Sequence, residues 1–190
     1  MCSSDLGSVA VRVDATPAAA WTLRVRIPEW AAGATLAVNG AAVSPAPAAG
    51  AYAEIRRAWK AGDAVELSLP MAPRLVEANP VVEHNRGQVA VMRGPLVYCV
   101  ESADLPAGID LDDVVLPVGA AWTVRHEPDL LGGVTVLECE ARVLPSAGAA
   151  PDLYRPVRTG GRPFRLRMVP YYAWCNRGPG DMSVWLPAGR

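Results

Sequence analysis

The sequence lacks the charge excess by which proteins attract polyanions. Lysine and arginine number 18 against 19 acidic residues, the formal net charge is -1, and lysine occurs once, as Lys60. Nucleic acid and anionic membrane surfaces are bound through a large field of one sign. Apolar runs long enough to cross a bilayer are also missing, because Arg, Asp, Gly or Pro interrupts each of them. Neither nucleic acid nor a membrane is therefore an expected partner.

Motifs for metals, phosphates and nucleophiles are missing as well. The two histidines, His84 and His126, are isolated, and the four cysteines form no C-x-x-C pair. Neither a glycine-rich phosphate loop nor a serine nucleophile motif occurs. The sequence predicts no metal ligand and no cofactor-binding residue, and we assign both histidines to turns or the surface.

The cysteines have the pattern of small core residues. Cys99 lies in a fully apolar run, and Cys139 falls on the apolar phase of an alternating segment. Free cysteine is among the most buried residue types, so both are expected in the core. Cys175 stands alone, and with Cys2 set aside the odd number that remains argues against a disulfide framework.

The first six residues, MCSSDL, carry neither the basic region nor the apolar stretch of a secretion signal. One codon choice for residues 2–6 spells the end of a common sequencing adapter. We therefore expect residues 1–6 to be non-native and the natural N-terminus to be missing.

Alternation of apolar and polar residues dominates the rest of the chain. It recurs at residues 9–13, 21–27, 65–69, 135–143 and 164–168. A period of two is the mark of strands with one buried face. Turn signals such as Asn39-Gly40 separate these segments, eighteen prolines punctuate the chain, and no long helical stripe occurs. The pattern predicts an all-β fold of antiparallel strands.

Two segments suggest how the chain is divided. Residues 88–100, QVAVMRGPLVYCV, are apolar on both faces except at Arg93-Gly94-Pro95, which predicts two buried strands joined by a bend. We place a domain boundary at this bend. Residues 145–156 have neither periodicity nor bulk and are expected to form an exposed loop.

Glu138 and Glu140 are the strongest catalytic candidates among the carboxylates. Two residues apart on one strand face, their side chains would lie about 7 Å apart. Inverting glycosidases hold their acid and base about 6.5 to 9.5 Å apart. Arg142 continues the same polar face, however, and charges on that face are typical of any solvated sheet. We favour the solvated face and keep an autonomous glycosidase as an alternative.

Tryptophan could supply a sugar-binding platform. The candidates are Trp30, Trp59, Trp122, Trp174 and Trp185. Trp185, however, stands between Val184 and Leu186, and Trp21 shares its phase with core positions. Large aromatics in β-proteins are more often core than ligand shelf. A carbohydrate-binding module that works through surface tryptophans is kept as the second alternative.

Five segments in order make up a recognisable pattern. They are RVRIPEW at 24–30, VNG at 38–40, RAWKAGDAVELSLPM at 57–71, VAVMRGPLVYCVE at 89–101 and MVPYYAWCNRGPGDMSVWLP at 168–187. This set resembles the C-terminal part of glycoside hydrolase family 127, the β-L-arabinofuranosidases, from about Gly7 to the end.

The resemblance implies a helical barrel that carries the active site, followed by two consecutive antiparallel, jelly-roll-like β-sandwich domains. This chain resembles the sandwiches only. Residues 7–93 plus 180–190 would form the first sandwich and residues 94–179 the second. The last strand would then return to the first sandwich.

The family's mechanism, as the resemblance implies it, uses a zinc-bound cysteine nucleophile and a glutamate acid/base in the helical barrel. Nothing in this sequence matches those residues, so no catalytic residue is assigned. We expect a non-catalytic fragment of a bacterial β-L-arabinofuranosidase that packs against the missing barrel of the same polypeptide. Zinc and arabinose-containing glycans would be bound by the parent enzyme.

Residues 171–185, YYAWCNRGPGDMSVW, crowd aromatics and charges together. The resemblance implies that they leave the second sandwich, turn at 176–180 and enter a closing strand at 183–185. Arg177 could fix this turn, because its five donors can tie loop carbonyls or a carboxylate such as Asp181 into one geometry.

Overall fold

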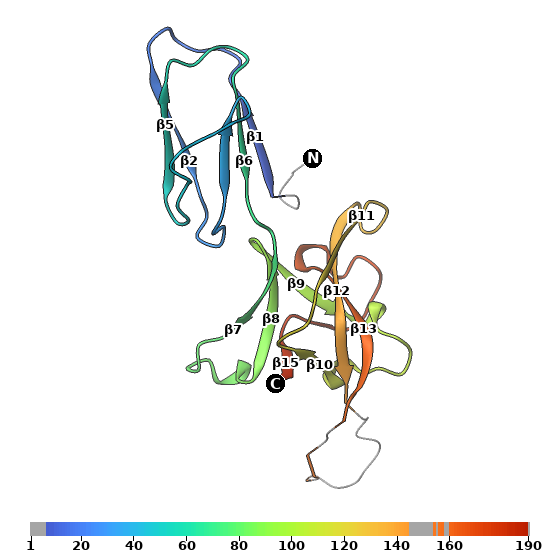
Figure 1. The fold of residues 1–190 in the computed structure, drawn as a ribbon. Helices are drawn as coiled ribbons and strands as arrows, with labels where there is room; N and C mark the ends of the chain where they lie inside the picture. The colour runs from blue at the N-terminus through green and yellow to red at the C-terminus, as the bar shows by residue number, and fades with distance from the viewer. Residues whose placement is uncertain (1–6, 145–153, 155, 158–159, 190) are drawn as a thin grey trace. The chain divides into compact units, whose positions relative to one another are not determined.

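The computed structural model describes residues 7–144, 154, 156–157 and 160–189. Residues 1–6, with Cys2, and most of the loop expected at 145–156 lie outside them. The described elements are β-strands and three-residue 3-10 helices (Figure 1), which confirms the all-β class. No helix in this part of the chain is long and apolar enough to cross a membrane. The chain divides into two units, residues 1–72 and 73–190.

The first unit contains two sheets. Its strands are β1 (Ser8–Arg12), β2 (Trp21–Arg26), β3 (Thr35–Val38), β4 (Ala41–Ala42), β5 (Tyr52–Arg57) and β6 (Ala64–Ser68). One sheet has the order β1-β6-β3-β4, and β2 pairs with β5 in the other. Buried residues of both sheets, among them Leu36, Ile55 and Val65, join one core cluster.

The turn between β3 and β4 has the geometry that its sequence predicts. Asn39 and Gly40 have φ of 52° and 77°, the left-handed values that a tight hairpin turn requires of both central residues. The Asn39 side chain donates to Asp63 Oδ1 at 2.8 Å, and its oxygen accepts from the Ala64 N–H at 2.8 Å. These bonds join the hairpin to the start of β6, and the bond from Asn39 is the main cause of a lowered pKa at Asp63.

The second unit is built around a closed barrel. Its strands are β7 (Pro73–Glu77), β8 (Gln88–Arg93), β9 (Leu96–Glu101), β10 (Val114–Pro117), β11 (Thr123–Glu127), β12 (Val134–Val143), β13 (Arg162–Pro170), β14 (Met182–Ser183) and β15 (Leu186–Gly189). Pairings run β8-β9-β13-β12-β10-β15 and return to β8, which closes a ring of six strands. The remaining three strands add to it, β7 on β8, β11 on β12 and β14 on β9.

Among the described residues of this unit, four 3-10 helices lie in the connections. They are η2 (Glu83–Asn85), η3 (Ser102–Asp104), η4 (Leu111–Asp113) and η5 (Tyr171–Ala173).

The inside of the barrel is one apolar cluster to which all six barrel strands contribute. Its buried members are Val89, Val91, Tyr98, Val100, Val114, Leu116, Leu137, Cys139, Ala141, Leu166, Met168 and Leu186. The polar end of Tyr98 is satisfied there, because its hydroxyl donates to the Thr135 carbonyl at 3.0 Å. A shared interior of this kind is why the strands close on one another.

A second, smaller cluster covers part of the outside of the barrel. Val134, Val136, Cys99, Val169 and Ala173 are its buried members. The first six residues of β12 are consequently buried on both faces. Trp174, Met182 and Val184 pack against this cluster, so the aromatic-rich stretch after β13 covers it.

The sandwich description therefore holds only at the level of the all-β class, because the second unit is a barrel. The bend at Gly94-Pro95 is where it was expected, between β8 and β9, but it is a hairpin inside the second unit. The division lies at Ala72/Pro73 instead. Residues 73–93 join the second unit because β8 pairs with β7, β9 and β15.

The closing strand pairs only in part as expected. β15 does pair with β8, which lies inside the expected first domain of 7–93. Its other partner is β10, in parallel, and β14 pairs with β9. Among the described residues, every strand partner of β14 and β15 thus belongs to the second unit, and neither strand completes the sheet of residues 8–68.

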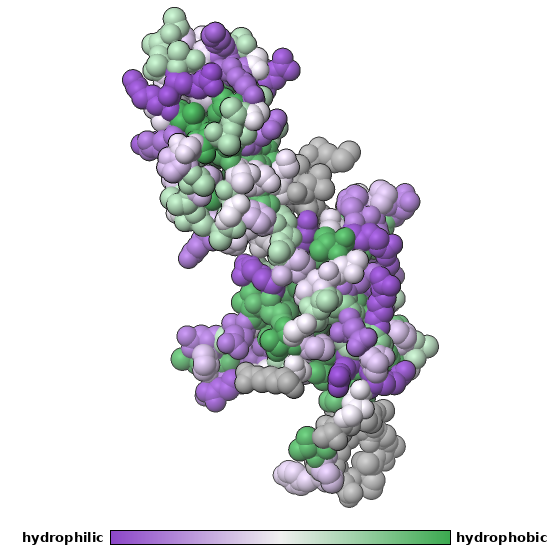
Figure 2. Space-filling view, in the orientation of Figure 1, coloured by the Kyte–Doolittle hydropathy of each residue, from purple (hydrophilic) through white to green (hydrophobic). Residues whose placement is uncertain are grey.

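The surface mixes polar and apolar residues on both units. On the face drawn in Figure 2, hydrophilic residues are scattered and hydrophobic ones are visible between them. Scattered apolar side chains on a surface are ordinary.

Leu116→Ala should test the barrel core. Leu116 is fully buried, so the truncation should lower the free energy of unfolding by about 2–5 kcal/mol. Val118→Ala, two residues further on and 53% exposed, is the matched control and should change it by less than about 0.5 kcal/mol. Chemical denaturation monitored by circular dichroism measures both, and equal effects would contradict a closed apolar interior.

Candidate functional site

Glu138 occupies a polar cluster on the outer face of β12. It is only 5% exposed. Arg165 of β13 donates to its Oε2, and Arg167 Nε and Arg125 Nη2 lie 3.3 and 3.2 Å from its Oε1. Glu127 joins the cluster, because it accepts from Arg167 at 2.9 Å. The solvated face that the sequence predicts is therefore wrong for Glu138.

The arginines determine the protonation state of Glu138. Burial acts to raise its pKa, but the hydrogen bonds and charges of Arg165, Arg167 and Arg125 together outweigh burial and lower it. A carboxyl group with a lowered pKa stays ionised at neutral pH and cannot supply the proton that a general acid must donate.

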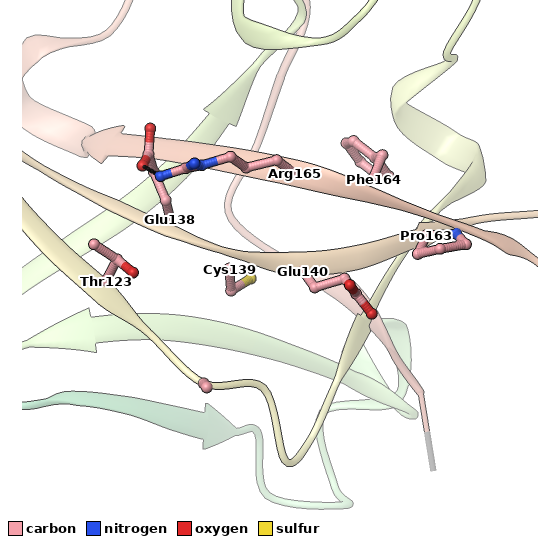
Figure 3. A pocket seen from close by; sticks show the side chains of 8 residues that line it. Thr123, Glu138, Cys139, Glu140, Pro163, Phe164 and Arg165 are labelled. Atoms are coloured by element: carbon pink, nitrogen blue, oxygen red, sulfur yellow. Dashed lines mark hydrogen bonds and ion pairs between the residues drawn. The ribbon is translucent and has the colours of Figure 1, made fainter.

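Glu140 has a different environment although it lies two residues away. It is exposed, and it lines an open pocket of about 420 Å³ whose lining also includes Glu138 and Arg165. Figure 3 shows Glu138 and Arg165 turned toward one another, and Glu140 turned the other way along β12. The two carboxylates thus do not converge on a common point, as a glycosidase pair would.

The cysteines occupy the positions that the sequence predicts. Cys99 and Cys139 are 0% and 5% exposed, which confirms both as core residues. Burial raises the pKa of each thiol to about 12, so neither forms the thiolate that a nucleophile or metal ligand needs. Cys175 is exposed. Within the described residues, no three His, Cys, Asp or Glu side chains are grouped as metal ligands would be.

The histidines and tryptophans do not assemble a site either. His84 lies in η2 and His126 in β11, both exposed. None of the six tryptophans is exposed. Trp59 is 4% exposed, its ring centroid lies 5.4 Å from that of Trp21, and it packs in the first core together with Trp30. Trp122 packs against the barrel interior and Trp174 against the outer cluster. Five indoles thus lie in or against a core cluster, and Trp185 is half-buried, so none belongs to an exposed platform.

Arg177 fixes the turn that precedes β14, but through other partners than expected. Its guanidinium donates to Asp104 Oδ1 at 2.8 Å and also to Glu101. The two carboxylate side chains are 6% and 8% exposed. The hydrogen bonds with Asp104 contribute most to a raised pKa of Arg177. Asp181 contacts Ser102 instead, through its backbone N–H at 3.0 Å.

Both clusters are assembled from segments far apart in the sequence. The alternation of Arg165 and Arg167 does mark the polar face of β13. Only the register, in which Arg167 stands opposite Glu138, brings these charges together. Asp104 and Arg177 are 73 residues apart, and no local motif signals their contact.

Comparison with known proteins shows which family has this arrangement. The Glycoside hydrolase family 127 C-terminal domain matches residues 73–187, and the Beta-L-arabinofuranosidase, GH127 middle domain, matches residues 3–71. The two matches meet where the structure divides into its units. The chain belongs to glycoside hydrolase family 127.

The relatives are much longer proteins. A non-reducing end β-L-arabinofuranosidase of Bifidobacterium longum subsp. longum is 42% identical over 173 residues, which are 85% of this chain and 25% of the relative. A solved glycoside hydrolase superposes with a TM-score of 0.90 at 42% identity, over 97% of this chain and 30% of its own. A solved GH127 β-L-arabinofuranosidase of Geobacillus stearothermophilus T6 superposes with a TM-score of 0.83 at 41% identity, over 96% of this chain and 29% of its own. This chain spans less than a third of each.

Glu138→Gln should destabilise the protein in a pH-dependent way. At pH 7 the loss should be about 1–3 kcal/mol, because Arg165 loses its ionised partner and Arg167 and Arg125 keep only Glu127. Since the folded-state pKa is lowered, this contribution is complete above the ordinary value of 4.5 and is lost as the pH falls through the folded-state value. Urea titrations at several pH values should show the wild type and variant converging in acid. Glu140→Gln, a change at an exposed residue, is the control. A difference in unfolding free energy between the wild type and Glu138→Gln that does not change with pH would contradict an ionised, arginine-paired Glu138.

Arg177→Ala should cost about 2–4 kcal/mol of stability, because it leaves two buried carboxylates side by side without a cation. Arg177→Lys should recover only part of the loss, since lysine cannot donate as a planar fork. The control is Arg24→Ala, which breaks an exposed pair with Glu54 of 2.7 Å and should cost less than about 0.5 kcal/mol. Thermal unfolding compares the three, and equal shifts for Arg177→Ala and Arg24→Ala would exclude a structural role for the Arg177 cluster.

Proposed function

We propose that this chain is a non-catalytic β-region of a β-L-arabinofuranosidase, which packs in the longer protein against a helical barrel that carries out hydrolysis. The observation that carries this proposal is that both matched domains are named as the middle and C-terminal domains of the family. The chain also covers only 25% of a β-L-arabinofuranosidase to which it is 42% identical.

The side-chain chemistry of the described residues supports a structural role. Glu138 is held ionised by arginines, and the two buried thiols have a raised pKa. Arg177 donates hydrogen bonds to Glu101 and Asp104, with which it forms ion pairs. These groups stabilise the barrel and its covering segment, and none is poised to attack or protonate a glycosidic bond. Zinc and the arabinose-containing substrate would be bound by the rest of the longer protein, as the family resemblance implies.

The first unit would serve as a two-layer β-sandwich in this arrangement. Its sheets β1-β6-β3-β4 and β2-β5 share one core, which supports the sandwich predicted for this part of the chain. The second layer has two strands against four in the first, so the two layers of the sandwich differ in width.

The isolated chain should release no arabinose from an aryl β-L-arabinofuranoside, with or without added zinc, because none of its described residues is placed to act as nucleophile or acid. The release of the aryl group is followed by absorbance, and the full-length Bifidobacterium longum relative is the positive control. Hydrolysis above the buffer rate that disappears in Glu140→Gln, a change at an exposed residue, would overturn the proposal.

A further inference from the structure

Strand β1 forms one edge of the four-stranded sheet in the first unit. Within the described residues it pairs with β6 alone (Figure 1). The carbonyl of Gly7 accepts from Leu69 N, and Val13 N donates to Asp63 O. Backbone groups alternate in direction along an antiparallel strand, so the odd-numbered residues face β6. The N–H and C=O groups of Ser8, Ala10 and Arg12 therefore point to the open edge.

The inner face of β1 is also incompletely covered. Val9 stands opposite Leu67 and Val11 opposite Val65 in the register, and cross-strand partners lie on the same face. Leu67 and Val65 are 6% and 1% exposed, whereas Val9 and Val11 are each 41% exposed. The opposite sheet has two strands against four, and this deficit leaves the core open at β1.

β1 carries less protection than the other edge strands described below. Edge strands are usually short, charged or interrupted by proline. β4 and β14 have two residues each, β7 starts with Pro73, and β11 carries Arg125 and Glu127. β1 has five residues, SVAVR, with one charge at its end.

We propose that β1 is the acceptor edge for an additional strand contributed by the rest of the longer polypeptide. The strand would be extended, with apolar side chains at alternate positions, so that its backbone bonds Ser8, Ala10 and Arg12 while its side chains cover Val9 and Val11. This inference rests on the proposed function and specifies one surface through which the chain joins the remaining protein.

The size of the surface favours this occupant over a second copy of the chain. A stable interface between separate proteins buries about 1,200–2,000 Å², which a five-residue edge with two half-exposed valines does not offer. A strand in the same polypeptide needs no such area, because tethering gives it a high effective concentration. The relatives have ample chain to supply it, since the matched region is 25–30% of their length.

The test uses two proline variants, one in each edge strand of the four-stranded sheet. Ala10→Pro removes an outward N–H from β1. Ala42→Pro removes the equivalent group from β4, the opposite edge, because Val43 N bonds Leu36 O and the preceding residue therefore points outward. Proline is tolerated where the N–H faces solvent. Each variant is made in the isolated chain and in a chimera. The chimera is the Bifidobacterium longum relative in which this chain replaces the matched region.

In the chimera, we expect the amide exchange of Ala10 and Arg12 to be slowed about tenfold or more relative to the isolated chain. Ala10→Pro should lower the melting temperature of the chimera more than Ala42→Pro, while the two act alike in the isolated chain. One outcome is a chimera that hydrolyses an aryl β-L-arabinofuranoside and yet shows the same amide exchange as the isolated chain and equal losses of melting temperature for the two proline variants. That result would overturn the inference and leave the proposed function standing. An inactive chimera would overturn the proposed function and the inference with it. Dimers of the isolated chain that Ala10→Pro abolishes would identify a second copy as the occupant and also overturn the inference.

Discussion

Closure of the barrel by β15 is the constraint on which the second unit depends. This four-residue strand lies between β8, which it meets in antiparallel orientation, and β10, which it meets in parallel. Its backbone also accepts from Val118 N and donates to Gly87 O. Without it, β8 and β10 would each expose an edge, and Leu186 would leave the core. The last strand of the chain is thus also the element that makes the interior continuous.

The segment that leads to β15 is held by a second interaction, the pairing of Arg177 with Glu101 and Asp104. Glu101 ends β9, and its side chain also accepts from the Cys175 N–H at 2.8 Å. Charge pairs with so little solvent exposure are strong only when every partner is present. The aromatic-rich stretch is consequently a covering segment whose polar residues anchor it, and this explains its crowding without any chemistry on a substrate.

Local patterns predicted the local features of this fold. The Asn39-Gly40 turn, the bend at Gly94-Pro95 and the burial of Cys99 and Cys139 follow from turn propensity and alternation, which are readable within a few residues. The Glu138 cluster and the partners of Arg177 were not predicted, because they depend on the register of strands distant in sequence. The same reason explains why the division of the structure at Ala72/Pro73 differs from the boundary expected at the bend. The apolar residues 88–93 could belong to either domain, and only their pairing with β7, β9 and β15 assigns them to the second unit.

The polar clusters of this member of glycoside hydrolase family 127 maintain a closed barrel, and the barrel depends on the course of β15. Backbone nuclear Overhauser effects in the isolated chain test that course most directly. We expect contacts of Leu186 with Val89 and of Ala188 with Leu116, the partners in the two ladders. Contacts of residues 186–189 with the strands of residues 8–68 would contradict that course and restore a sandwich completed by its last strand.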